Sequence, residues 1–119
     1  MELTVEKTGD VAVVALPVEE LDAGNTAEFK RDVAAILDEN PRIVFDLDKV
    51  RFIDSSGLGA FLSCLRKASA RGGDVKLCRL SKRVRTVFEL VRLHRVLDIR
   101  DTREAALAAF SRPAERPTA

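Results

Sequence analysis

Two successive hydrophobic patterns typical of β-strands occupy residues 2–16. Over the first six of these residues, apolar and polar side chains alternate, as in a strand with one buried face. Gly9-Asp10 is a turn signal, and the continuous apolar run that follows from Val11 is typical of a central strand. Pro17 ends this run because it has no backbone donor. The pattern predicts an N-terminal β-hairpin.

From residue 25 the spacing changes to that of an amphipathic helix. Asn25 or Thr26 can cap its start, and Asn40-Pro41 ends it. A short apolar strand follows at residues 43–45, and its position after a helix favours a parallel strand that is buried on both faces. The apolar face of the predicted helix consists of Phe29, Val33, Ile36 and Leu37.

A second helix is predicted after residue 57, and Gly72-Gly73 provides its C-terminal cap. Its apolar residues recur at the spacing of one helical face, and we expect Phe61 and Leu62 to be buried in the core. At such a site, the substitution Leu62→Ala costs about 2–5 kcal/mol of folding free energy. The whole apolar face consists of Leu58, Phe61, Leu62 and Leu65.

The remaining residues predict two further strands and two further helices. The strands are expected at residues 75–80 and 96–99, and Ser81 and Thr102 can each cap the helix that follows. The last nine residues, 111–119, contain two prolines and few apolar side chains, which predicts a flexible tail. The third helix has Val84, Val87, Phe88 and Val91 on its apolar face, and the fourth has Ala105, Leu107 and Phe110.

The predicted order of elements, β-β-α-β-α-β-α-β-α, indicates an α/β fold. Strands that alternate with helices of this length need crossover connections and therefore form a mostly parallel sheet. We predict one domain over residues 1–110, with a mixed sheet of four to five strands that includes the N-terminal hairpin. About four helices are expected to pack mainly on one face of this sheet.

Composition excludes several functional classes. The chain has no Trp or Tyr and only six Phe, which leaves little material for aromatic anchors or base-stacking surfaces. Its apolar runs are too short to span a membrane, and it has no secretory leader, so we expect a cytoplasmic protein. Cys64 and Cys78 match no zinc or redox spacing, and we interpret both as small buried side chains.

The charges are distributed unevenly along the chain. Residues 1–50 carry 5 Lys/Arg and 12 Asp/Glu, whereas residues 51–119 carry 15 and 7, although the net charge is only +1. One interpretation is a nucleic-acid partner for the basic stretch from Arg79 to Arg100. The favoured interpretation is that both halves share one solvated surface, because the stretch lacks aromatic residues and any recognition-helix pattern.

The segment Asp54-Ser55-Ser56-Gly57 lies between the third predicted strand and the second predicted helix. Loops at the carboxyl ends of parallel strands are where ligands and partners meet such folds. A hydroxyl at a helix start lies beside unpaired N–H groups and the positive end of the helix dipole, which favours a phosphate there by about 0.3–1 kcal/mol. The alternative is an ordinary helix cap, because these residue types are also common in turns.

A catalytic role for Ser55 has little support in the sequence. The nucleophile elbow requires Gly two residues before the serine, where this chain has Ile53. The single histidine, His94, is followed by Arg95, and a neighbouring cation disfavours the protonated state that a general base must reach. With one histidine and no clustered thiols, the sequence predicts no metal site and no cofactor.

Residues 54–62, Asp-Ser-Ser-Gly-Leu-Gly-Ala-Phe-Leu, resemble the signature of STAS domains in the bacterial anti-sigma factor antagonists. The resemblance extends over about residues 3–110 and implies a regulatory protein that is not an enzyme. It also implies partner contacts around the signature, at Asp22, Asp54, Ser56, Gly57, Leu58 and Gly59. Further similarities occur at Leu21-Asp22, Phe45-Asp46-Leu47, Gly72-Gly73 and Phe88-Glu89-Leu90.

The resemblance implies a mechanism known as partner switching. The unphosphorylated antagonist binds an anti-sigma factor that is also a serine kinase, and this binding releases the sigma factor. The kinase then phosphorylates the first serine of the pair, here Ser55, and the complex dissociates. A serine phosphatase of the metal-dependent type restores the hydroxyl. ATP and magnesium belong to these partners, and no direct contact with nucleic acid or membrane is implied.

One departure from the family pattern lies after Leu90, where the family has glycine or another small residue and this chain has Val91-Arg92. A left-handed cap at Arg92 would be strained, so we expect the third helix to end differently. Two alternative functions also remain open. The domain could serve a signalling or lipid-transport complex without being phosphorylated, or, with less support, it could bind nucleic acid.

Overall fold

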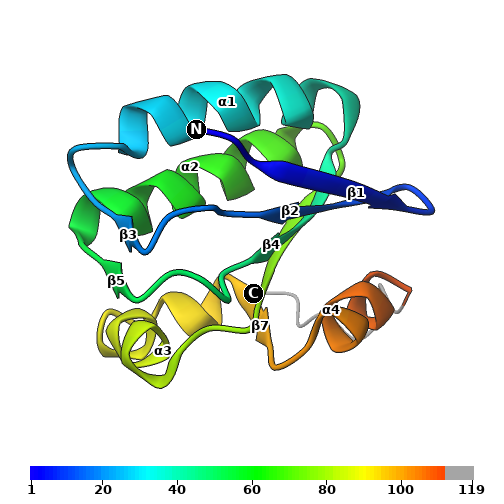
Figure 1. The fold of residues 1–119 in the computed structure, drawn as a ribbon. Helices are drawn as coiled ribbons and strands as arrows, with labels where there is room; N and C mark the ends of the chain where they lie inside the picture. Colours follow the sequence, from blue (N-terminus) through cyan, green and yellow to red (C-terminus); the bar gives the residue numbers. More distant parts are fainter. Residues whose placement is uncertain (112–119) are drawn as a thin grey trace.

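The structure, a computed structural model, describes residues 1–111, in which strands alternate with helices (Figure 1). The tail predicted from residue 111 onward lies, apart from Ser111, outside the described residues. In chain order the elements are β1 (Thr4–Thr8), β2 (Val11–Ala15), β3 (Glu20–Leu21), α1 (Thr26–Glu39), β4 (Arg42–Asp46), β5 (Phe52–Ile53), α2 (Ser55–Ala70), β6 (Asp74–Cys78), α3 (Lys82–Leu90), the 3-10 turn η1 (Leu93–Arg95), β7 (Asp98–Arg100) and α4 (Arg103–Phe110).

Five of the strands form one mixed sheet in the order β1-β2-β4-β6-β7. β1 and β2 form an antiparallel hairpin whose turn places Gly9 at a φ of 61°. β2, β4, β6 and β7 all run parallel to one another. The predicted hairpin and mixed sheet are therefore confirmed, and β4 is the buried parallel strand expected at residues 43–45.

Four phenylalanine rings form the centre of the main core. The centroids of Phe29, Phe45 and Phe61 lie 5.3–5.6 Å apart, and the ring of Phe88 lies 6.1 Å from that of Phe61. All four side chains are fully buried. Because they come from α1, β4, α2 and α3, this cluster packs three helices against one face of the sheet. The prediction that the helices lie mainly on one face is confirmed.

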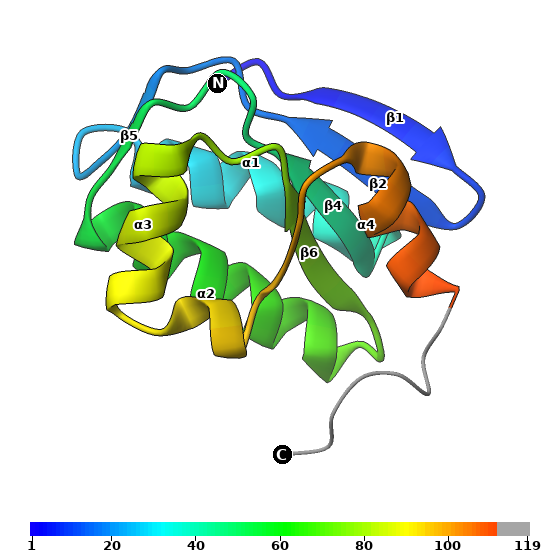
Figure 2. The same cartoon turned by 90° about the horizontal axis from the view of Figure 1, so that it is seen from below.

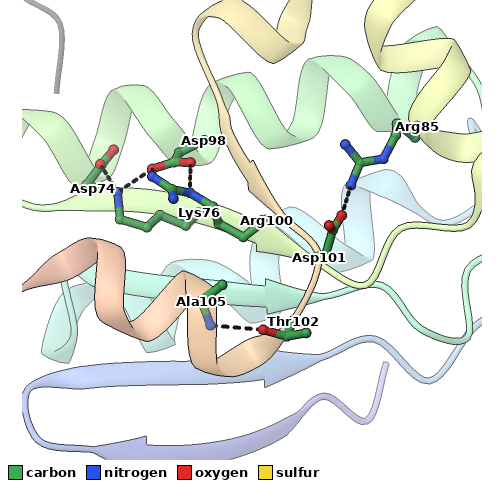
Figure 3. Close-up of polar contacts among 8 residues, drawn as sticks. All are labelled: Asp74, Lys76, Arg85, Asp98, Arg100, Asp101, Thr102 and Ala105. Carbon is green, nitrogen blue, oxygen red and sulfur yellow. Dashed lines mark hydrogen bonds and ion pairs between the residues drawn. The ribbon is translucent and has the colours of Figure 1, made fainter. Parts of the chain in front are cut away.

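Helix α4 packs on the opposite face of the sheet (Figure 2). Its Ala106 is buried in a smaller apolar cluster that includes Cys78 of β6. Beside this cluster, the buried ammonium of Lys76 lies 3.0 Å from a carboxylate oxygen of Asp98, an ion pair seen in Figure 3. Burial alone would raise the pKa of Asp98, but hydrogen bonds from Arg100 and Lys76 outweigh burial and lower the pKa.

Two of the predicted helix caps are confirmed in full, and the third is confirmed in position only. The hydroxyl of Ser81 accepts a hydrogen bond from the N–H of Val84 at 3.2 Å. The hydroxyl of Thr102 accepts one from the N–H of Ala105 at 3.0 Å, as drawn in Figure 3. At the start of α1, Asn25 has the N-cap position, but its side chain makes no cap hydrogen bond.

The prediction for the last strand is wrong in its position. We predicted residues 96–99, whereas β7 spans Asp98–Arg100 and Val96 is exposed. The physical reason is the turn that precedes the strand. Leu93–Arg95 form η1, and the N–H of Leu97 donates to the carbonyl of Leu93 at 2.8 Å, so the chain becomes extended only after Leu97.

Two core predictions are also wrong. Phe61 is fully buried as predicted, but Leu62 is only partly buried, because it lies at the margin of the buried face of α2. Val91 is exposed, because α3 ends at Leu90 and Val91 is its C-cap residue. The buried face of α2 consists of Gly57, Leu58, Ala60, Phe61, Cys64 and Ala68.

Candidate functional site

The segment Asp54-Ser55-Ser56-Gly57 begins helix α2, as the sequence predicted. Asp54 is the N-cap residue, and its Oδ1 accepts a hydrogen bond from the N–H of Gly57 at 3.1 Å. Its backbone carbonyl accepts from the N–H of Leu58 at 3.0 Å. The carboxylate therefore does the capping, and the Ser55 hydroxyl is not needed for it.

A second, two-stranded ladder brings the loop before α1 to this helix start. β3 pairs in parallel with β5, Leu21 opposite Ile53, and the N–H of Asp54 donates to the carbonyl of Leu21 at 3.3 Å. The Oδ2 atom of Asp54 accepts from the N–H of Ala23 at 3.1 Å. Sequence periodicity could not detect this ladder, because each of its strands is only two residues long.

Asp22 lies in the loop that this ladder positions. Its Oδ1 accepts from the N–H of Gly24 at 2.9 Å, and its own N–H donates to the Oδ1 of Asn25 at 3.0 Å. The amide of Asn25 also donates to the carbonyl of Glu20 at 2.8 Å. The Asn25 side chain stabilises this loop, which explains why it does not cap α1.

Exposure separates the two serines of the segment. Ser55, the first residue of α2, is exposed, whereas Ser56 is partly buried. Within residues 1–111, neither serine hydroxyl makes a hydrogen bond to the backbone. The Ser55 hydroxyl therefore faces solvent at the positive end of the α2 dipole.

Packing requires glycine at position 57 but not at position 59. A Cβ atom added to Gly57 would lie 2.5 Å from Cγ1 of Ile53 and 2.7 Å from the carbonyl oxygen of Leu21. Gly57 is therefore required by the packing of α2 against the β3–β5 ladder. A Cβ atom added to Gly59 would meet no atom within 4 Å, and Gly59 is exposed. Only Gly59 leaves open space for the backbone of another protein.

The structure thus places the predicted partner-binding residues in one region but at different depths. Asp22, Asp54 and Ser56 are partly buried, Gly59 is exposed, and Gly57 and Leu58 are buried beneath them. Sequence reasoning missed Phe52, whose side chain is 44% exposed on β5, two residues before Asp54. The available signal was its alternation with Ile53, which is buried on the other side of the strand.

The histidine and the two cysteines are the remaining side chains considered for acid–base or thiol chemistry. His94 is exposed in η1, after the end of α3. Cys64 and Cys78 are buried, as predicted, and burial raises the pKa of each thiol to about 12. Both thiols are therefore protonated at neutral pH.

Helix α3 ends in the left-handed conformation that we predicted it would avoid. Arg92 has φ 60° and ψ 26°, and its N–H donates to the carbonyl of Glu89 at 3.0 Å. The hydrogen bond closes the helix end and holds the arginine in a conformation that glycine adopts more readily. The expectation of a different ending is wrong.

Residues 2–106 match the family model of the STAS domain. BtrV of Bordetella bronchiseptica, a candidate anti-sigma factor antagonist, is 31% identical over 111 residues, which cover 92% of this chain and 95% of BtrV. The chain belongs to the STAS domain family. The resemblance seen in the sequence is thereby confirmed.

Solved structures agree with this assignment. A candidate anti-sigma factor antagonist of Thermotoga maritima is 29% identical, with a TM-score of 0.82, over 92% of this chain and 95% of its own. The antagonist SpoIIAA in its unphosphorylated form is 25% identical, with a TM-score of 0.75, over 92% and 96%. The Bacillus SpoIIAA in its phosphorylated form, at 24% identity and a TM-score of 0.67, shares the fold.

Crossing a bilayer takes a helix of about 20 mostly apolar residues. In the part of the chain that the structure describes, no helix is long and apolar enough for this.

Proposed function

We propose that this chain is an anti-sigma factor antagonist that works by phosphorylation-controlled partner switching at Ser55. In its unphosphorylated form it binds an anti-sigma factor that is a serine kinase, and the sigma factor is released. Phosphorylation of Ser55 abolishes this binding. The observation that carries the proposal is an exposed hydroxyl at the first position of α2, in a STAS domain.

The local geometry supports a phosphate on Ser55 without a change of fold. The α2 cap is made by Asp54, so modification of the Ser55 hydroxyl breaks no cap hydrogen bond. The phosphate would lie at the positive end of the helix dipole. SpoIIAA has the same fold in its unphosphorylated and phosphorylated forms, and both resemble this chain.

The size of the expected effect follows from electrostatics. Two like charges about 4 Å apart repel by about 4 kcal/mol at an effective dielectric constant of about 20. A tenfold change in affinity corresponds to about 1.4 kcal/mol. One phosphate at the centre of a contact can therefore weaken binding by about a thousandfold.

The proposal includes the rest of the cycle. A serine phosphatase of the metal-dependent type regenerates the Ser55 hydroxyl, and the cycle takes place in the cytoplasm. ATP and magnesium are bound by the kinase and the phosphatase, and this chain contributes no catalytic residue. Around Ser55, the kinase contacts Gly59 directly, Asp22, Asp54 and Ser56 at their exposed edges, and the backbone supported by Gly57 and Leu58.

The test begins with co-purification and mass spectrometry, which identify the partner and the Ser55 occupancy together. The purified kinase and ATP are then added, and the modified peptide is mapped. Ser55→Ala should bind the kinase but accept no phosphate. Ser55→Asp should bind the kinase more weakly than wild type but more tightly than the phosphorylated protein does. Ser56→Ala is the matched control for the phosphate site and should still accept phosphate on Ser55.

Each alternative predicts a different result. Phosphate on Ser56 alone would move the site by one residue. If neither serine is modified and Ser55→Asp binds normally, the domain is an interaction module of a signalling or lipid-transport complex, and the proposed switch is wrong. Nanomolar, sequence-dependent binding to duplex DNA at physiological salt would favour the nucleic-acid interpretation of the basic stretch.

A further inference from the structure

Exposed apolar side chains gather where α3 ends. Within residues 1–111, five large hydrophobic side chains are exposed, and three of them lie within seven consecutive residues. Leu90 is 77% exposed, Val91 55% and Val96 47%. We call residues 90–96 the α3 corner. Single exposed apolar residues are normal, but a group of them is typical of a contact surface.

Positive charge lies at both ends of α3, at its first residues and at the α3 corner. Lys82, Arg83, Arg92 and Arg95 are exposed, and none of their side chains forms an ion pair with another residue among 1–111. Glu89 is the one exposed carboxylate on the same helix.

Other arginines of the same stretch are neutralised within the fold. Arg85 pairs with Asp101 at 2.8 Å, Arg79 with Asp48 at 2.6 Å, and Arg100 with Asp98 at 2.7 Å. The uncompensated charge is therefore concentrated at α3 and its corner, and it is not spread over the basic stretch as a whole.

The α3 corner lies on the same side of the molecule as the start of α2. Figures 1 and 2 show α3 beside β5 and the first turns of α2. Phe88, two residues before Leu90, contacts Phe61 in the second turn of α2 with ring centroids 6.1 Å apart. Ser55 begins the same helix, and β5, which carries the exposed Phe52, contacts both α2 and α3. One protein that covers Ser55 can reach the α3 corner.

We infer that the α3 corner is a second contact surface for the kinase, and that it receives an acidic amphipathic segment of that protein. This inference rests on the proposed function. Apolar residues of the segment would cover Leu90, Val91 and Val96, and carboxylates would pair with the four free cations. A protein fits better than a lipid surface, because the patch is small and α3 packs against β5, which leads directly into the helix that begins at Ser55.

The corner would supply affinity and partner choice, whereas Ser55 supplies the switch. Complementary charge raises the rate of association and excludes partners with a basic surface. Because no cation of the corner is used by the fold, each is available to the partner without loss of an internal ion pair.

The test uses the purified full chain and the kinase identified by co-purification, with affinity measured by isothermal titration calorimetry. Leu90→Ser should weaken binding at least tenfold. Arg92→Gly should weaken it several-fold and reduce its salt dependence, while the fold is kept because glycine suits the left-handed conformation there. Val5→Ser on β1 and Lys67→Gln on α2 are matched apolar and charge controls and should bind like wild type.

The results separate this inference from the proposed function. If Leu90→Ser and Arg92→Gly bind like wild type while Ser55→Asp loses affinity, the inference is wrong and the switch stands. If the corner variants lose affinity while Ser55→Asp binds normally, the corner stands and the switch is wrong. Binding of the chain to phosphatidylglycerol vesicles that is lost in Leu90→Ser, with kinase affinity unchanged, would instead assign the corner to a lipid surface and refute the inference.

Discussion

The carboxylate of Asp54 joins the two loops of the site, because its Oδ2 accepts a hydrogen bond from the N–H of Ala23, 3.1 Å away and 31 residues earlier in the chain. Its Oδ1 caps α2 through the N–H of Gly57 at the same time. One side chain therefore positions both the loop that contains Asp22 and the helix start that contains Ser55.

Replacement of Asp54 should separate its two roles. Asp54→Ala loses both hydrogen bonds and should cost about 1–3 kcal/mol of unfolding free energy in a urea titration. Asp54→Ser keeps a capping oxygen but is too short to reach Ala23 as well, so its cost should be intermediate. If the serine variant is as stable as wild type, the bridge to Ala23 contributes nothing to stability.

Alanine at the two site glycines should have opposite effects. Gly57→Ala places a Cβ atom against Ile53 and the Leu21 carbonyl and should destabilise by about 1–3 kcal/mol. Gly59→Ala meets open space in a helix and should stabilise by about 0.5–1 kcal/mol. Thermal unfolding of both variants beside wild type gives the comparison, and equal effects at the two positions would contradict the packing described for Gly57.

The two neighbouring core residues of α2 should differ in their contribution to stability. Phe61→Ala should cost about 3–5 kcal/mol, because it opens a cavity among the three rings that Phe61 contacts. Leu62→Ala should cost clearly less, since its side chain is only partly buried. Urea titrations of the two variants decide the order, and a larger loss for Leu62 would place it, rather than Phe61, at the centre of the core.

Neither cysteine should react with a thiol reagent in the folded protein. With a pKa of about 12, each thiol is ionised at pH 8 in only about one molecule in ten thousand, and each is also buried. A colorimetric disulfide exchange assay should detect two thiols in urea and almost none under native conditions. Rapid native labelling that is absent in Cys78→Ser would show that the face beneath α4 opens.

Hydrophobic periodicity determined the order and type of the main elements. The N-terminal hairpin, the four helices and the parallel strands follow from short-range patterns, because side-chain spacing reports which face of a helix or strand is buried. The caps at Ser81 and Thr102 were also predictable, since a cap depends on a side chain and a backbone N–H three residues away. The signature around Ser55 likewise identified the family.

Tertiary contacts decided what the site is made of. The β3–β5 ladder, the bond from Ala23 to Asp54 and the close approach of Gly57 to the Leu21 carbonyl all join residues that lie more than about 30 positions apart in the chain. No local pattern encodes such pairs. Arg92 shows the same limit, because its left-handed conformation is unfavourable locally and is held by a hydrogen bond to Glu89 and by the turn that follows. The sequence alone therefore determined the fold and the serine pair, whereas long-range packing decided how that serine is presented.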